Sequence, residues 1–329
     1  MQSTARGRIV VLGTGGTIAG TSVDPHDNVG YSAAQIGIGQ LVATISAVAG
    51  ADLESEQVAQ IDSKDMDHAT WQRLARRVAH HLARAEVSGI VITHGTDTLE
   101  ETAYFLQRVL APAKPVVMTG AMRPATALLA DGPQNLLDAV SIAGITGARG
   151  VTTAFAGSLH SAFDVRKVHS YRPDAFGSGD AGPIGRIAEG QLRRARDWPN
   201  GTAIGLAAIE SDPAAWPRVE IVFNHAGASA RGVDALLAQG IDGLVAAGTG
   251  NAKFGQALDD ALLAAERAGV QLLRCSRCAI GPVVTADGPA AGEAANARVA
   301  AQDRTPFQAR IDLLLQLLVA RTRQSPVPG

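Results

Sequence analysis

The first two-thirds of the chain alternate short apolar runs with longer amphipathic stretches. The apolar runs are rich in β-branched residues and are typical of buried strands; they are Arg8–Leu12, Gln57–Ile61, Gly89–Thr93, Pro115–Thr119 and Val151–Ala156. The amphipathic stretches predict helices at Ala34–Ala47, Asp67–Ala85, Asp97–Val109 and Gly132–Ala143. Strands that alternate with helices indicate an α/β fold whose sheet is mostly parallel and flanked by helices.

Turn-forming and helix-breaking residues then interrupt the alternation between Gln191 and Pro217. We therefore predict a larger N-terminal domain at 1–190, a linker at 191–217 and a smaller C-terminal α/β domain at 218–329. The pattern resumes there, with strands at Val219–Phe223, Gly243–Ala247 and Val270–Cys275 and helices at Val233–Gln239, Gly255–Ala268 and Pro306–Arg321. A length of 329 residues fits two domains, because it exceeds what one hydrophobic core usually organises.

Composition narrows the class of protein. Hydrophobic residues at 46% and charged residues at 18% are typical of a globular chain. The net charge of -2 argues against a nucleic-acid binder, and no apolar run of roughly 18 residues predicts a membrane span. The apolar run Ile9–Leu12 is too short for a secretory signal, so we expect a cytoplasmic protein, or a periplasmic one if a signal peptide has been removed.

Two cysteines, Cys275 and Cys278, form a C-x-x-C spacing. This spacing is found in redox pairs and in zinc sites, but a structural zinc site needs four ligands and the chain has no second cysteine pair. We interpret the two as ordinary thiols at a strand end and expect no metal.

A glycine-rich loop, Gly13–Gly20, follows the first predicted strand. Its spacing misses that of a phosphate-binding loop, and it lacks the lysine that would meet the phosphates. A second interpretation is a nucleophile loop, in which Thr17 presents its hydroxyl and backbone N–H groups hold an oxyanion. A third is a tight turn. The polar segment after it is typical of a lid, and Tyr31 at its end could exchange a proton with Thr17.

A second polar loop, Thr93–Glu101, follows another predicted strand. Asp97 and Glu100 have capping-box-like spacing, so Asp97 could simply cap the next helix. In the functional interpretation, Asp97 binds a substrate ammonium while Thr96 handles protons. His94 receives no catalytic role, because at a strand end it could simply bond the backbone.

Two segments, Gly15–Gly20 and Ile92–Ala103, closely resemble the signature segments of bacterial asparaginases and glutaminase-asparaginases. Val116–Pro124, Ala130–Leu136 and Ala247–Asn251 are similar to that family as well. The resemblance implies a large and a small α/β domain and a homotetramer built from tight dimers, with each active site between the N-domain of one subunit and the C-domain of its neighbour. It implies neither a metal nor an organic cofactor.

The resemblance also assigns roles to residues of this sequence. Thr17 matches the nucleophile, Tyr31 its mobile-loop partner, and Thr96, Asp97 and Lys167 a second polar triad. Ser63 matches a residue that holds the substrate α-carboxylate. The other matched positions expected to bind substrate are Gly16, Gly95, Ala121 and Asn251.

We therefore expect an L-asparaginase that hydrolyses asparagine through an acyl-threonine intermediate. The base stays open: Lys167 could act through Thr96, but a lysine ordinarily holds its proton well above neutral pH and Asp97 strengthens that hold. Tyr31 is the alternative base. Lys167 could also merely pair with Asp97, and Ser63 could merely cap the helix near Asp67.

Two departures from the family pattern affect the substrate. Lys64 stands where many members carry glutamine or glutamate, and it would repel an α-ammonium unless it turns away. The glutamate that many members supply from the neighbouring subunit falls near Asp287 and Gly288. The alternatives are a glutaminase-asparaginase, an amidase for another small amide, or a catalytically silent ligand-binding protein of the same fold.

Overall fold

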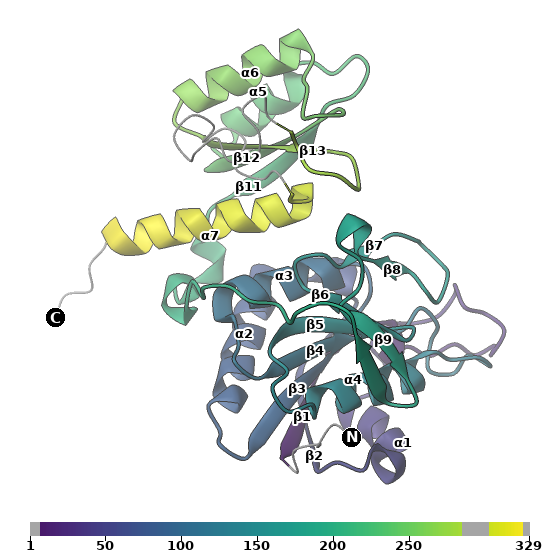
Figure 1. The fold of residues 1–329 in the computed structure, drawn as a ribbon. Helices are drawn as coiled ribbons and strands as arrows, with labels where there is room; N and C mark the ends of the chain where they lie inside the picture. Colours follow the sequence, from purple (N-terminus) through teal and green to yellow (C-terminus); the bar gives the residue numbers. More distant parts are fainter. Residues whose placement is uncertain (1–6, 285–302, 325–329) are drawn as a thin grey trace. The chain divides into compact units, whose positions relative to one another are not determined.

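The computed structural model describes residues 7–284 and 303–324. The chain folds into two compact units, Met1–Leu206 and Ala207–Gly329 (Figure 1). Within the described residues, no helix combines the length and the apolarity that a membrane span requires.

The first unit is built on an eight-stranded sheet in the order β10-β9-β6-β5-β4-β3-β1-β2. The five strands from β2 to β5 pair in parallel, and β6, β9 and β10 continue the sheet antiparallel. The strands are β1 Arg8–Gly15, β2 Leu53–Ile61, β3 Val87–Thr93, β4 Pro115–Thr119, β5 Gly150–Phe155, β6 Ser158–Ser161, β9 Gly185–Ala188 and β10 Gln191–Arg194. The predicted mostly parallel sheet is confirmed.

Helices cover both faces of this sheet (Figure 1). On one face α1 (Ile38–Ala49) and α4 (Gly132–Ala143) pack side by side, and on the other α2 (His68–Leu82) packs against α3 (Leu99–Leu110). Strands covered on both faces need apolar residues at successive positions rather than at alternate ones. Val10, Val11 and Leu12 accordingly are all fully buried in β1.

Several sequence predictions need correction. The first helix begins at Ile38 rather than at Ala34, because Ala34 has a φ of 57° and Gly37 is the extended N-cap. Gln191–Arg194 belongs to the sheet as β10 and pairs with β9, although the sequence placed it in a linker. Polar residues dominate this edge strand, so no apolar pattern marks it.

The second unit has a three-stranded parallel sheet in the order β11-β12-β13. Its elements are β11 Val219–Phe223, α5 Arg231–Ala238, β12 Gly243–Gly248, α6 Gln256–Arg267, β13 Gln271–Ser276 and α7 Pro306–Gln324. Helix α7 packs against all three strands, and α5 packs against α6 (Figure 1). Alternate residues of β12 serve the two faces: Leu244 joins the α5 and α6 core, whereas Gly243 lies against Leu313 of α7. The smaller α/β unit is therefore confirmed.

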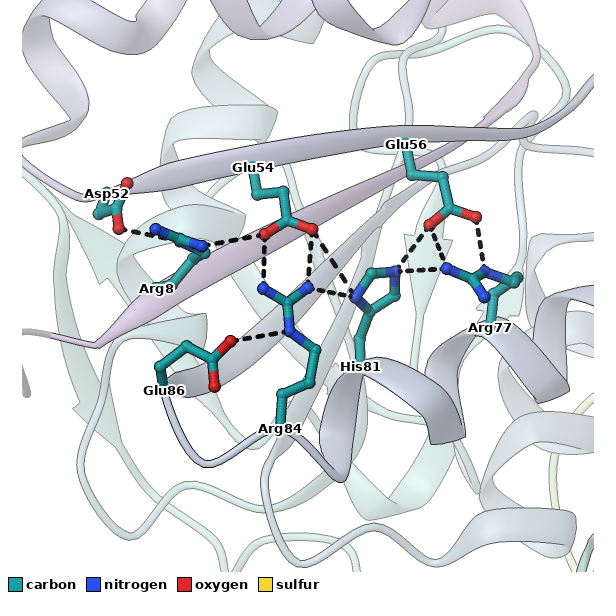
Figure 2. Close-up of polar contacts among 8 residues, drawn as sticks. All are labelled: Arg8, Asp52, Glu54, Glu56, Arg77, His81, Arg84 and Glu86. Atoms are coloured by element: carbon teal, nitrogen blue, oxygen red, sulfur yellow. Dashed lines mark hydrogen bonds and ion pairs between the residues drawn. The ribbon is translucent and has the colours of Figure 1, made fainter.

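A chain of charged side chains ties the edge strand β2 to α2 and β1 (Figure 2). Glu54 accepts hydrogen bonds from both terminal nitrogens of Arg84, at 2.7 and 2.8 Å. Arg84 also donates to His81 Nδ1 at 2.9 Å. Because a guanidinium can only donate, Nδ1 is the acceptor of this bond, and Nε2 lies 2.7 Å from Glu56 Oε2. The buried His81 therefore links two strand carboxylates on the outermost strand.

Replacing Glu54 by glutamine should make the protein less stable at neutral pH and less sensitive to acid. The hydrogen bonds from Arg84 lower the pKa of Glu54 to about 2. A carboxylate whose pKa is depressed in the folded state stabilises the fold fully at pH values above the ordinary carboxyl pKa. This stabilisation is lost as the pH falls toward 2. We expect the thermal midpoint of Glu54→Gln to drop by about 3 °C at pH 7, with a smaller difference from wild type near pH 2. Glu86→Gln removes an exposed partner of Arg84 and is the control; an equal drop there would contradict the assignment.

Candidate active site

Three parallel strand ends meet at one edge of the large sheet. β1 lies between β2 and β3, and Gly13 pairs in register with Thr93. The N–H of Gly16 donates to the carbonyl of Ile61, the last residue of β2, at 2.9 Å. The loops that carry Thr17, Ser63 and Thr96 therefore leave the same edge, which is where ligands bind in parallel sheets.

The closest approach between these loops is made by two glycines. Gly16 has a φ of 81°, and a Cβ there would lie 2.3 Å from both the Cα and the nitrogen of Gly95. The two backbones thus touch where a side chain could not fit. Thr17 and Thr96 are the residues that follow, so the contact brings the two predicted threonines to the same place.

Substituting Gly16 by alanine should therefore damage the site. The methyl group would push the two loops apart, and we expect kcat to fall about 50-fold, because small displacements of reacting groups are costly. Gly147→Ala is a matched control, since Gly147 has a φ of 80° but nothing within 4 Å of its Cβ position. Steady-state rates and thermal midpoints of both variants check this, and a Gly16→Ala enzyme with the kinetics of the control would contradict it.

Thr17 begins a short 3-10 turn, Thr17–Ala19, and is 7% exposed. Its hydroxyl lies 2.6 Å from that of Tyr31, and either oxygen can be the donor. The segment between them closes on itself through two backbone hydrogen bonds between Thr21 and Ser32. Ser22 also bonds Thr126, which holds the base of this loop against the segment after β4. The loop thus delivers Tyr31 to Thr17.

Lys167 joins the second pair of predicted residues. It lies in β7, Arg166–Lys167, which pairs antiparallel with β8, Phe176–Gly177. The Lys167 ammonium donates to Thr96 Oγ1 at 2.9 Å and to Asp97 Oδ1 at 2.6 Å. Lys167 is 18% exposed at its side chain, whereas that of Asp97 is 53% exposed. The structure therefore brings Thr96, Asp97 and Lys167 together.

Three polar groups around these residues are free to meet a ligand. Within the described part of the chain, the backbone N–H groups of Thr17 and Thr96 have no hydrogen-bond partner. Unpaired N–H groups in a covered position are rare, and two of them suit a developing oxyanion. Asp97 uses Oδ1 for Lys167, while Oδ2 has no partner in the same residues.

Ser63 lies under the second loop and begins a short 3-10 helix, Ser63–Asp65, that precedes α2. It is 2% exposed, its hydroxyl accepts the N–H of Asp97 at 3.2 Å, and its carbonyl accepts Thr98 Oγ1 at 2.8 Å. Asp67 caps α2 instead, by accepting the N–H of Thr70. The interpretation of Ser63 as a helix cap is therefore wrong.

Asp97 is not a helix cap either. The N-cap of α3 is Thr98, and the carboxylate of Asp97 is used by Lys167. Glu100 reaches the backbone N–H of Lys167, a contact that the sequence spacing did not predict. The sequence shows Glu100 three residues after Asp97, but the partner of Glu100 is 67 residues away in the chain, so spacing alone does not predict this contact.

Lys64 turns to its own neighbours. Its ammonium lies 2.7 Å from Asp62 Oδ2 and 3.2 Å from Asp65 Oδ2 and is 60% exposed. These two carboxylates offset its charge. The repulsion expected between Lys64 and a substrate ammonium is accordingly weakened.

Two further residues of the signature segments are buried. His94 is fully covered, and its Nδ1–H donates to the carbonyl of Gly95 at 2.7 Å. Burial lowers the pKa of His94 to about 4, so the ring is neutral. The backbone role considered for His94 is thus what the structure shows. Ala121 is also fully buried, in the core cluster with Ile18, so its side chain is not presented to a ligand.

The second unit carries the remaining residues that the sequence analysis considered for the site. The Asn251 carboxamide exchanges two hydrogen bonds with the backbone of Val284, at 2.5 and 2.6 Å. Asp287 and Gly288 lie outside the described residues. Cys275 is buried and Cys278 exposed, and both are free thiols. In the described ranges, no three His, Cys, Asp or Glu side chains are grouped to hold a metal ion.

A threonine hydroxyl beside a second hydroxyl, with a lysine–aspartate pair at the adjoining strand end, could support hydrolytic chemistry. Comparison with family models identifies the class. Residues 8–200 match the N-terminal asparaginase domain, and residues 218–326 match the glutaminase/asparaginase C-terminal domain. The chain belongs to the asparaginase family, hydrolases that act on the amide of asparagine.

Individual relatives cover nearly the whole chain. The glutaminase-asparaginase of Pseudomonas fluorescens biotype A is 36% identical over 96% of this chain and 87% of its own. L-asparaginase 2 of Escherichia coli strain K12 is also 36% identical, over 96% of this chain and 89% of its own. A crystal structure of a probable cytoplasmic L-asparaginase from Campylobacter jejuni matches with a TM-score of 0.86 at 36% identity, covering 94% of this chain and 95% of that one.

Proposed function

We propose that this protein is an L-asparaginase that cleaves the side-chain amide of L-asparagine with Thr17 as nucleophile. One observation carries the proposal: the Thr17 hydroxyl is bonded to Tyr31, and the backbone before Thr17 touches the loop of Thr96 and Asp97, the two residues that bind Lys167. Nucleophile, proton-handling groups and unpaired N–H donors therefore share one strand edge.

The reaction proceeds in two halves. Thr17 Oγ1 attacks the carboxamide carbon, and the N–H groups of Thr17 and Thr96 stabilise the negative oxygen that forms. The carbon–nitrogen bond breaks, and the nitrogen leaves as ammonia after it gains a proton. Water then attacks the threonine ester, which releases aspartate and restores the hydroxyl.

Two routes are available for the Thr17 proton. Tyr31 is in direct contact with the hydroxyl at 2.6 Å, and it can take that proton only while its own phenolic proton passes to another acceptor, such as a carboxylate of the substrate. The other route runs through Thr96, whose hydroxyl accepts from Lys167 and has its own proton to give. A lysine can complete that route only in its neutral form, because an ammonium has no lone pair to take a proton. The two routes predict different activities for substitutions at position 167.

The substrate α-ammonium is assigned to Asp97. The Asp97 carboxylate is half-exposed, and only its Oδ1 is bound by Lys167. The charged Oδ2 can therefore accept a hydrogen bond from an ammonium group. The substrate carboxylate is assigned to Ser63, beside the same loop. Both end groups are common to asparagine and glutamine. Because two relatives of similar identity carry different names, glutaminase-asparaginase is the second candidate.

Ammonia release from L-asparagine and from L-glutamine tests the proposal. We expect the purified wild type to release ammonia from asparagine with the higher kcat/KM. A higher value for glutamine would favour the second candidate. Release from neither would contradict the amidase function and favour a silent binding protein.

We also propose a cytoplasmic homotetramer made of tight dimers. Support for the compartment comes from the Campylobacter jejuni relative, whose title calls it cytoplasmic, although a Haemophilus influenzae relative is named periplasmic. Support for the assembly is the family resemblance. Light scattering on the purified protein should give four times the chain mass of 33.9 kDa.

A further inference from the structure

One short segment of the chain binds both the backbone N–H and the side-chain ammonium of Lys167. Thr96 and Asp97 bind its ammonium, and Glu100, in the first turn of α3, accepts its backbone N–H through Oε2. The three partners lie within five consecutive residues of the sequence, and Lys167 is 67 to 71 residues further along. A single loop-to-helix junction therefore fixes where this amine lies.

The backbone of Lys167 has little other support. β7 is only two residues long, and it pairs with β8 along one of its edges. The N–H of Lys167 points away from that partner to Glu100. Phe176, across from Lys167 in β8, is anchored by contact with Phe155 at 4.8 Å between ring centroids. Among the described residues, no strand pairs with the other edge of β7, and Glu100 binds the backbone at that edge.

We propose that Glu100 is a positioning residue for the reaction, which by its hydrogen bond to the backbone of Lys167 sets the ammonium against Thr96 and Asp97. This rests on the proposed function, because it gives Lys167 a task in catalysis. In the described part of the chain, the Glu100 side chain makes no hydrogen bond to Asp97 or Ser63, the residues assigned to substrate. Its effect passes through the two-residue strand to the amine.

The surroundings of Glu100 make this bond sensitive near neutral pH. Burial raises the pKa of Glu100 to about 7, and the bond from Lys167 opposes that rise. The charged groups that face it are Glu101 on the same helix, which raises the pKa, and Arg166 and Lys167 on β7, which lower it. A protonated carboxyl is a weaker acceptor than a carboxylate, so the hold on Lys167 should loosen as the pH falls below this value.

Three substitutions at position 100 separate geometry from charge. Glu100→Gln keeps the length and an acceptor oxygen but removes the charge. Glu100→Asp keeps the charge but is too short to reach, and Glu100→Ala removes both. We expect kcat to fall about 30-fold in the Asp and Ala variants with KM within about threefold of wild type. The Gln variant should lose only about threefold, because its neutral oxygen still accepts the N–H of Lys167, as a protonated Glu100 does. Glu101→Ala, on the same helical turn, is the control and should leave kcat unchanged.

The pH profile and hydrogen exchange provide readouts beyond folding. The kcat of wild type should decline about threefold as the pH falls below about 7, to the level of the Gln variant, which should lack this decline. Amide exchange in the peptide that carries Lys167 should accelerate in the Asp and Ala variants and stay near wild type in Gln.

The possible outcomes distinguish this inference from the proposed function. An inactive wild type would defeat the function, while the exchange data would still test the contact between Glu100 and Lys167. With an active wild type, full activity of Glu100→Ala and Glu100→Asp would overturn the positioning role. Equal losses in the Gln and Ala variants would also overturn it, since they would assign the effect to charge.

Discussion

Replacing Thr17 by valine should lower kcat for asparagine at least ~1,000-fold, as expected when a nucleophile is removed. Valine has the shape of threonine without its hydroxyl, so the turn at Thr17–Ala19 should persist. Thr17→Ser, which keeps a hydroxyl, should retain measurable turnover. Rates of ammonia release at saturating asparagine measure both effects.

Thr21→Val is the matched control, because Thr21 lies on the same loop and holds it through its backbone rather than its side chain. We expect its kcat to stay within about twofold of wild type, a change no larger than a surface substitution usually makes. Full activity of Thr17→Val would show that another group attacks the amide. Equal losses at positions 17 and 21 would mean that the loop had lost its structure.

Replacing Lys167 by methionine should lower kcat about 300-fold, within the range of a lost proton-transfer group. Methionine has similar length and no charge, so it leaves Thr96 and Asp97 without their common partner. KM should rise less than kcat falls, because the Asp97 oxygen assigned to the substrate ammonium is still present. A loss confined to KM would contradict a part for Lys167 in the chemical step.

Lys167→Arg then decides between the two proton routes. Arginine keeps the positive charge but does not lose its proton at any workable pH. If Lys167 only holds Asp97 and Thr96, the arginine variant should recover much of the activity that the methionine variant loses. If the proton leaves through Thr96 to the lysine, the arginine variant should be as inactive as the methionine variant. The thermal midpoints of both variants show whether the larger side chain is tolerated.

The parts of the fold that the sequence predicted are those with a local pattern. β4, α4 and β11 were predicted with their observed bounds, because apolar or amphipathic stretches end there in glycine, alanine or polar residues. The rule that ligands lie beyond the strand ends then directed attention to Thr17 and Thr96. Structure confirms that β1 and β3 are neighbours in register.

The parts that escaped prediction depend on contacts between distant residues. β6, β9 and β10 are four residues each, and antiparallel pairing rather than an apolar run defines them. The partner of Asp97 is equally remote: its spacing to Glu100 suited a helix cap, but Lys167, 70 residues later, supplies the ion pair. The assignment of Lys167 came from family resemblance, since the two-residue strand that carries it has no signature.

The most direct test is to locate the acyl group on the enzyme during turnover. Wild type is mixed with asparagine, quenched in acid within milliseconds to seconds, and mapped by peptide mass spectrometry. We predict one aspartyl ester, on Thr17 in the peptide that contains the glycine-rich loop, and none in Thr17→Val. An acyl group on Thr96 or Tyr31, or undiminished turnover by the enzyme with valine at position 17, would contradict the account.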